Sequence, residues 1–207
     1  MLVNNFDKLT TFFDRLENSE DFYYIQIIQR KKDGHIKSEH TIKTYYIYNK
    51  EQFLSLKSEI IELCEKFNAR AYFWVNPRNA RKVSLECIKL FATHLEQNSC
   101  TSGQNVWDKC CGKNPASNYV HYWIVDIDNS DPEYLLKIIR LIHKCRCKEL
   151  PLIKDIIPTV NGCHILTCGF DLHHFKQLCM IDKIDIMDIH KDNPTILYYA
   201  KNERQDM

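Results

Sequence analysis

Apolar residues recur along the chain with helical spacing in some segments and strand-like alternation in others. Spacings of three and four residues predict amphipathic helices over residues 5–19, 51–68, 80–97, 131–142 and 171–180. Runs of aromatic and β-branched residues predict strands over residues 69–75, 119–129, 184–190 and 195–199. Two further segments, 22–48 and 156–167, predict hairpins that turn at Asp33-Gly34 and Asn161-Gly162. Segment 98–118 has no periodicity, and we expect a long loop there.

This mixture of elements predicts an α+β fold in which a mixed or antiparallel sheet is flanked by helices. With 207 residues, the chain is long enough for one domain with a substantial core. Hydrophobic residues make up 44% and charged residues 27%, which is typical of a soluble globular protein. Because no run of about 18 apolar residues occurs and the N-terminal residues lack a signal-peptide pattern, we expect a cytoplasmic protein with no membrane partner.

Net charge and glycine spacing narrow the classes of partner. The net charge is +1, so the field of the whole molecule does not favour nucleic acid, although a local basic face still can. One basic stretch is the tip of the first hairpin, with Arg30, Lys31, Lys32 and Lys37, which suits either a strand-tracking groove or a solvated turn. The five glycines are not spaced for a phosphate-cradling loop, which excludes P-loop and Rossmann sites.

Ten cysteines are many for a chain without a signal peptide, and we expect thiols rather than a disulfide framework. The pair Cys110-Cys111 and the pair Cys145 and Cys147 are poorly spaced for structural zinc. Cysteine is also among the most readily buried residue types. A zinc site therefore stays open but is not favoured.

The segment Tyr119–Asn129 is a run of aromatic and β-branched residues that ends in two aspartates. In a strand, residues i and i+2 point to the same face, so Asp126 and Asp128 project together. Neighbouring like charges repel, and a divalent cation held by oxygen ligands usually offsets this repulsion. The alternative is a strand that ends in a solvated turn, since the sequence from Asp128 to Pro132 also resembles a helix N-cap.

Other polar residues also stand at the ends of predicted strands. His164 follows Gly162 just past a tight turn, and Asp188 lies on the penultimate predicted strand. Asp185 shares that strand but lies three residues away, on the opposite face, so only one of the two acids should reach a metal held by the aspartate pair. Arg78 follows the strand that ends at residue 75, where turn chemistry and a surface charge are the alternatives.

The order of these motifs resembles that of the archaeo-eukaryotic primase superfamily, the primase-polymerase fold, in its phage and mobile-element members. The aspartate pair matches the first motif, and Ala71–Arg78 looks like the strand-to-Arg segment ahead of it. Pro158–Thr167 is similar to the second motif, and Asp188–Tyr198 resembles the third. The resemblance covers roughly residues 70–200 and implies an RRM-like catalytic core there. Residues 1–69 would then be a helix-hairpin-helix part of the same domain, and 201–207 a polar tail.

The resemblance implies a template-dependent nucleotidyltransferase, a DNA primase or primase-polymerase. Its partners would be a single-stranded DNA template, nucleoside triphosphates, and a helicase or other replication protein. Asp126, Asp128 and Asp188 would be the catalytic residues and would hold Mg²⁺ or Mn²⁺. The nucleotide-binding residues would be His164, Arg78, Asn193, Gly162 and Lys191, with His190 close enough in sequence to contribute.

One departure from the family lies in the second motif, which usually has Ser two residues before its His. That position is Gly162 here, so a hydroxyl contact to the phosphates is missing or replaced by a backbone amide. This departure, the small size and the neutral charge motivate an alternative, a non-catalytic nucleotide- or nucleic-acid-binding module of the same fold in a replication complex. A metal-dependent nuclease with the same acids ranks last, because it does not need the His and Arg contacts to a triphosphate.

Overall fold

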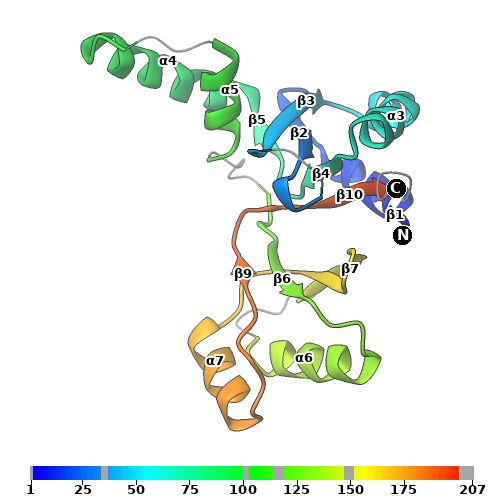
Figure 1. Ribbon diagram of the computed structural model, residues 1–207. Helices are drawn as coiled ribbons and strands as arrows, with labels where there is room; N and C mark the ends of the chain where they lie inside the picture. The colour runs from blue at the N-terminus through cyan, green and yellow to red at the C-terminus, as the bar shows by residue number, and fades with distance from the viewer. Residues whose placement is uncertain (1, 34–36, 100–102, 114–118, 147–151, 201–207) are drawn as a thin grey trace.

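Two antiparallel sheets organise the protein, and the segment that runs from β9 into β10 passes from one sheet to the other (Figure 1). The computed structural model describes residues 2–33, 37–99, 103–113, 119–146 and 152–200. Within these residues, seven α-helices accompany the two sheets, so the predicted α+β class is confirmed. None of the described helices has both the length and the apolar character needed to cross a membrane.

The larger sheet has the strand order β1-β10-β4-β2-β3, and β5 also pairs with β2. Its strands are β1 (Leu2–Asn4), β2 (Asp21–Gln29), β3 (His40–Ile47), β4 (Arg70–Trp74), β5 (Arg78–Asn79) and β10 (Pro194–Ala200). Because side chains alternate along β2, Tyr23 and Ile25 enter the main apolar core while Phe22 and Tyr24 enter a second cluster. The helices that supply the main core are α1 (Phe6–Thr10), the 3-10 helix η1 (Thr11–Arg15), α2 (Lys50–Ser55) and α3 (Lys57–Phe67).

The second cluster fixes two helices on the other side of β2. These are α4 (Ala80–Glu96) and α5 (Gly103–Cys111), which contribute Val83, Cys87, Val106 and Cys110. A short 3-10 helix, η2 (Lys31–Asp33), follows β2. In Figure 1, α4 extends away from both sheets, and only its base lies near α5 and β5.

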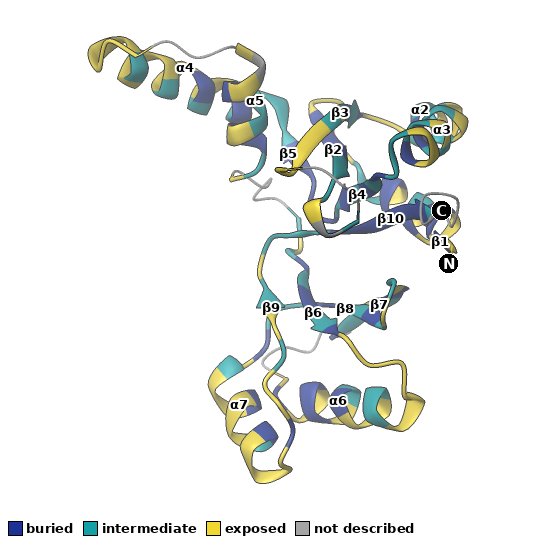
Figure 2. Ribbon diagram, viewed as in Figure 1, coloured by how far each residue is buried: buried dark blue, intermediate teal, exposed yellow. Residues whose placement is uncertain are grey.

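The smaller sheet has the strand order β7-β8-β6-β9. Its elements follow the chain as β6 (Trp123–Ile127), α6 (Pro132–Lys144), β7 (Ile153–Pro158), β8 (Cys163–Thr167), α7 (Leu172–Ile181) and β9 (Ile189–His190). This β-α-β-β-α-β order, with β6 and β8 in the centre, is the split βαβ arrangement. Val125, Ile127 and Ile165 face α6 and α7 in one core, and the buried sides of both helices turn inward (Figure 2).

Most predicted elements are present, and four differ. The predicted helix 5–19 ends at Arg15 and is divided into α1 and the 3-10 helix η1. The segment 98–118 is not simply a long loop, because residues 103–111 form α5. The predicted strand 184–190 pairs only as β9, and the predicted helix 51–68 is divided into α2 and α3. The sequence predicted that the N-terminal part of the domain ends at residue 69 and the catalytic core begins at residue 70. This boundary lies at the start of β4, which pairs with β2 and β10 inside the larger sheet. The Gly34 turn and the 201–207 tail lie outside the described residues.

Candidate functional site

Strand pairing in the smaller sheet brings two predicted site residues to either side of Asp126. On one side, Asp126 of β6 lies directly opposite His164 of β8. On the other side, its backbone N–H donates to the carbonyl oxygen of Asp188 at 2.9 Å, which continues the β6–β9 register by one residue. Residues directly opposite one another in antiparallel strands point to the same face, and so does Asp128, two residues further on. The register therefore places Asp126 and His164 on one face and brings Asp188, one residue before β9, across from Asp126, while Asp128 follows one residue after β6.

This face turns toward the larger sheet. Ile124 and Leu166, which lie opposite each other on the same face, belong to the main core together with side chains of the larger sheet. Beyond this apolar contact, the two sheets leave a cleft of about 380 Å³. Its polar lining includes Asp126, Asp128, His164, His190 and Asn193 and, from the larger sheet and the ends of its strands, Arg30, Arg70, Glu39 and Tyr72. Four sequence-predicted site residues thus share one cleft: Asp126, Asp128, His164 and Asn193.

His164 connects the acidic face to the larger sheet. Its Nε2 lies 3.4 Å from Oδ1 of Asp126, and its Nδ1 lies 2.8 Å from the hydroxyl oxygen of Thr195. Thr195 is fully buried near the start of β10, so it can hold the imidazole at a fixed angle. The His164 side chain is 15% exposed and the Asp126 side chain 34%, so both remain accessible from the cleft.

Two arginines line the opposite wall of the cleft, and each is paired with a carboxylate. Arg30 donates from Nε to Glu39 and from Nη1 to the hydroxyl of Tyr72, each at 3.1 Å. Arg70 forms a two-pronged ion pair with Asp33, and its guanidinium stacks on the ring of Tyr199. Since the Arg30 side chain is 31% exposed and that of Arg70 only 12%, Arg30 is the cation better placed to meet an anion in the cleft.

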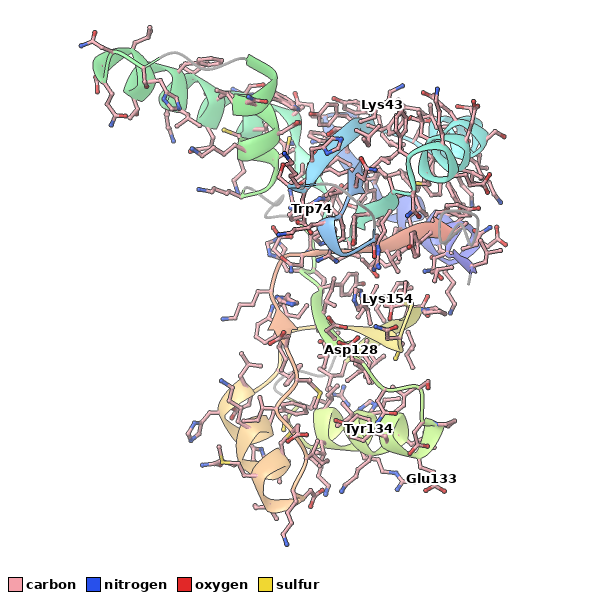
Figure 3. All side chains as sticks on the ribbon, viewed as in Figure 1. Lys43, Trp74, Asp128, Glu133, Tyr134 and Lys154 are labelled. Carbon is pink, nitrogen blue, oxygen red and sulfur yellow. The ribbon has the colours of Figure 1, made fainter. Side chains whose placement is uncertain are left out.

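A second cleft, of about 430 Å³, adjoins the first through the same two aspartates. Asp126 and Asp128 line it together with Asp185 and Asp188. Figure 3 shows Asp128 beyond β6, on the side toward Tyr134 of α6, which also lines this cleft. Burial and the nearby Asp185 carboxylate both raise the pKa of Tyr134. The register of β6 and β9 favours Asp188 over Asp185 as the third acid, because Asp188 lies directly across from Asp126.

The acids on this face have the donor chemistry of a hard divalent cation, since Mg²⁺ and Mn²⁺ prefer carboxylate oxygens. Within the described ranges, no three His, Cys, Asp or Glu side chains already stand close enough to hold a metal ion. Asp128 and Asp188 are exposed, so their side chains have room to turn. The backbone thus fits a shared cation, whereas the side chains would need to turn toward one another.

Gly162 has a structural role at the end of the acidic strand. A Cβ at this position would lie 2.0 Å from the carbonyl oxygen of Ile127 and 2.8 Å from the backbone nitrogen of Asn129. Both contacts are with backbone, which cannot move aside without displacing the segment that carries Asp128. Position 162 therefore requires glycine, since only a residue without a Cβ lets the turn before β8 lie this close to β6.

The structure does not place Arg78 in the cleft. Its guanidinium has no exposed surface and donates to the carbonyl oxygens of Asn76 and Cys111, and its Nη2 lies 2.9 Å from Asp192. The predicted contact between Arg78 and a nucleotide is therefore wrong for this conformation, and so is the alternative of a surface charge. A buried guanidinium needs such partners, and here they join β5 to α5 and to the turn before β10.

Lys191 also lies apart from the cleft, because its ammonium sits over the ring of Trp123, 5.1 Å from the centroid. Trp123 packs against the α6–α7 core, so Lys191 belongs to the opposite side of β6 from Asp126. The cysteine pairs considered for zinc are also separated, since Cys110 and Cys111 lie in the α4–α5 cluster and Cys145 in the α6–α7 core. Cys147 lies outside the described residues.

Sequence reasoning missed Thr195 and Arg70 as site residues and assigned Arg30 only to a basic hairpin tip. Each lies on the larger sheet, so its position depends on how the two sheets meet and not on a local pattern. Comparison of the chain with family models, with curated proteins and with solved structures gives no match.

Proposed function

We propose that this protein is a metal-dependent nucleotidyltransferase that joins nucleoside triphosphates on a single-stranded DNA template, as a primase or primase-polymerase does. The observation that carries the proposal is the strand register that sets Asp126 between His164 and Asp188, with Asp128 on the same face. The split βαβ order of the smaller sheet also supports an RRM-like core, in which β6 and β8 are the central strands.

The acidic face would bind the reacting end of the nucleotide. Asp126, Asp128 and Asp188 would hold one or two Mg²⁺ or Mn²⁺ ions. Such ions offset negative charge on the phosphates and on the departing pyrophosphate. The reaction forms a bond between a 3′-oxygen and the α-phosphorus and breaks the bond from that phosphorus to the β-phosphate. Three carboxylates on one face repel a bare triphosphate, so this assignment requires a cation between them.

His164 would orient the triphosphate. If the Thr195 hydroxyl donates to Nδ1, the remaining proton of a neutral imidazole is on Nε2, which faces the cleft beside Asp126. That N–H would donate to a phosphate oxygen once the cation occupies Asp126. Arg30 would approach from the opposite wall, and Asn193 would contact the sugar-phosphate part of the nucleotide.

Primer extension tests the proposal. The wild-type protein should extend a labelled primer on a single-stranded template with Mg²⁺ or Mn²⁺, and chelation of the metal should abolish the product. Asp126→Ala combined with Asp128→Ala should lower the rate by roughly a thousandfold, since the metal contributes several kcal/mol. Asp7→Ala is a matched control, because this carboxylate is fully exposed on α1. Absence of metal-dependent incorporation by the wild type would sink the proposal.

A second candidate is a non-catalytic module that binds nucleic acid or nucleotide. The observation that favours it is that no three metal-binding side chains of the described residues already stand together. Fluorescence anisotropy with labelled single-stranded DNA and with a labelled nucleotide separates the two candidates. Tight binding of DNA without metal-dependent binding of nucleotide would favour the module. Both candidate functions are compatible with a helicase or another replication protein as a partner.

A further inference from the structure

Helix α4 carries a second apolar face that the described residues leave largely exposed, although Gly103 of α5 lies close to the Phe91 ring. Its inner face, with Val83, Cys87 and Leu90, packs in the α4–α5 cluster. Its outer face consists of Leu85, Ile88, Phe91 and Leu95, whose exposed fractions are 52%, 64%, 37% and 75%. Scattered exposed leucines are ordinary, but a contiguous apolar strip on one helix is typical of an interaction surface. Figure 2 shows the outer part of α4 as largely exposed.

The spacing of this outer face suits a partner helix. Leu85, Ile88, Ala92 and Leu95 follow one another at intervals of three, four and three residues, which is the seam of a coiled coil. The helix also extends away from both sheets (Figure 1), so a second helix can lie along it without meeting the rest of the described chain. Polar side chains flank the apolar seam on one side, where Lys89 forms an ion pair with Glu86 of its own helix at 2.6 Å.

We propose that two copies of this chain pair through the outer faces of α4, with the two helices antiparallel. In that arrangement, Leu85 meets Leu95 of the second copy, and Ile88 meets Ala92 of the second copy. A large side chain thus faces a small one at the centre, which suits close packing. The two Phe91 rings would lie near the symmetry axis on one flank and add apolar surface there.

Charge favours a second copy in the antiparallel direction. Arg81 is exposed at the N-terminal end of α4 and Glu96 at its C-terminal end. Antiparallel pairing brings Arg81 of each copy to the end of the other helix, where Glu96 and the negative end of the helix dipole lie. Parallel pairing would instead place Arg81 beside Arg81 and Glu96 beside Glu96. The outer face is therefore complementary to itself in one orientation only.

The pairing is expected to be weak, because α4 has only 17 residues and a standard interface involves roughly 20–30 residues on each side. We expect a dissociation constant on the order of 10 µM, with the dimer forming and separating reversibly. Sedimentation equilibrium between about 1 and 200 µM should show a mass that rises from 24.7 kDa toward twice that value.

Two substitutions on the outer face test the surface. Ile88→Glu combined with Leu95→Glu should keep the far-UV circular dichroism and hold the protein monomeric across the whole range of concentration. Ile181→Glu is the matched control, because Ile181 is an equally exposed isoleucine on α7, at 73%. It should leave the dimer unchanged. A wild type that stays monomeric, or a dimer that survives in the double variant, overturns the proposal.

A charge reversal tests the direction of pairing and does not depend on the apolar substitutions. Arg81→Glu and Glu96→Arg should each weaken the dimer by roughly threefold to tenfold, while the variant with both changes should regain wild-type affinity. In a parallel pair the combined variant would gain nothing from the second change. Failure of the combined variant to recover therefore overturns the antiparallel arrangement. Neither result depends on catalysis by the cleft.

Discussion

The buried Arg78 allows a sharp test of how the two halves of the chain are held together. Its side chain is 0% exposed and forms an ion pair with Asp192, whose side chain is 21% exposed. The guanidinium lies over the ring of Trp74, with 5.1 Å between Cζ and the ring centroid. Arg78→Met keeps an unbranched apolar stem but is shorter, and it removes the charge and every hydrogen bond that the Arg78 side chain donates. Asp192 would then lose its ion-pair partner but keep the hydrogen bond that its Oδ1 accepts from Nδ2 of Asn76 at 3.1 Å, and two backbone carbonyls would lose the guanidinium as donor.

The magnitude follows from the burial of the pair. Removing one partner of a buried ion pair typically costs about 3–5 kcal/mol, because the other charge is left without compensation. Asp192 keeps some contact with water, so the expected loss lies near the lower end, at about 3 kcal/mol. For a chain of this size, that corresponds to a fall in Tm of about 6–12 °C. Arg140→Met, at an exposed arginine on α6, should change stability by less than about 0.5 kcal/mol.

Urea unfolding with linear extrapolation measures the loss in free energy, and nucleotide titration of the folded variant measures affinity. We expect a large loss of stability with nearly unchanged nucleotide affinity under conditions where the variant is folded. The reverse outcome, a loss below about 1 kcal/mol together with abolished nucleotide binding, would refute the structural role and restore the phosphate contact expected from sequence.

Three further predictions concern the site and the core. Gly162→Ala should lower the free energy of unfolding by about 3 kcal/mol, because its Cβ would overlap the backbone of β6; a urea midpoint within error of wild type contradicts this. Thr195→Val should lower metal-dependent incorporation at least roughly tenfold by releasing His164, and Thr195→Ser should restore most of it; full activity of the valine variant argues against this positioning role. Cys168 is partly exposed, whereas burial raises the pKa of Cys64 to about 12. Mass spectrometry after brief alkylation at pH 8 should therefore find Cys168 modified before Cys64 and the other buried cysteines of the described residues, and equal rates would contradict the described packing.

The fold was predictable where the pattern is local. The N-cap at Asp131, which accepts from the backbone N–H of Glu133 at 3.0 Å, and the apolar spacing of α6 both lie within one short segment. Helix α5 was missed because its apolar positions include Cys110 and Cys111, which were considered as thiols or zinc ligands. Val106 and Cys110 are four residues apart and both buried, which is the helical signal that the polar residues around them obscured.

Only those site residues that share one predicted strand could be placed together from the sequence. Two-residue periodicity is enough to put Asp126 and Asp128 on one face. It cannot say that Asp188 pairs across from Asp126, because that contact joins segments about 60 residues apart. For the same reason, the burial of Arg78 was not foreseen, since its partner Asp192 lies 114 residues further along the chain. Contacts between the two sheets decide which polar side chains meet.

The proposed function requires that the acidic face of the smaller sheet bind a divalent cation and a triphosphate together. A crystal of the protein soaked with Mn²⁺ and a non-hydrolysable nucleoside triphosphate tests this requirement, since manganese is identified by its anomalous scattering. We expect manganese bound by Asp126, Asp128 and Asp188, with the triphosphate reaching His164. A bound nucleotide whose manganese contacts none of these aspartates would contradict the proposed function. So would a crystal in which neither manganese nor the nucleotide binds at saturating concentration.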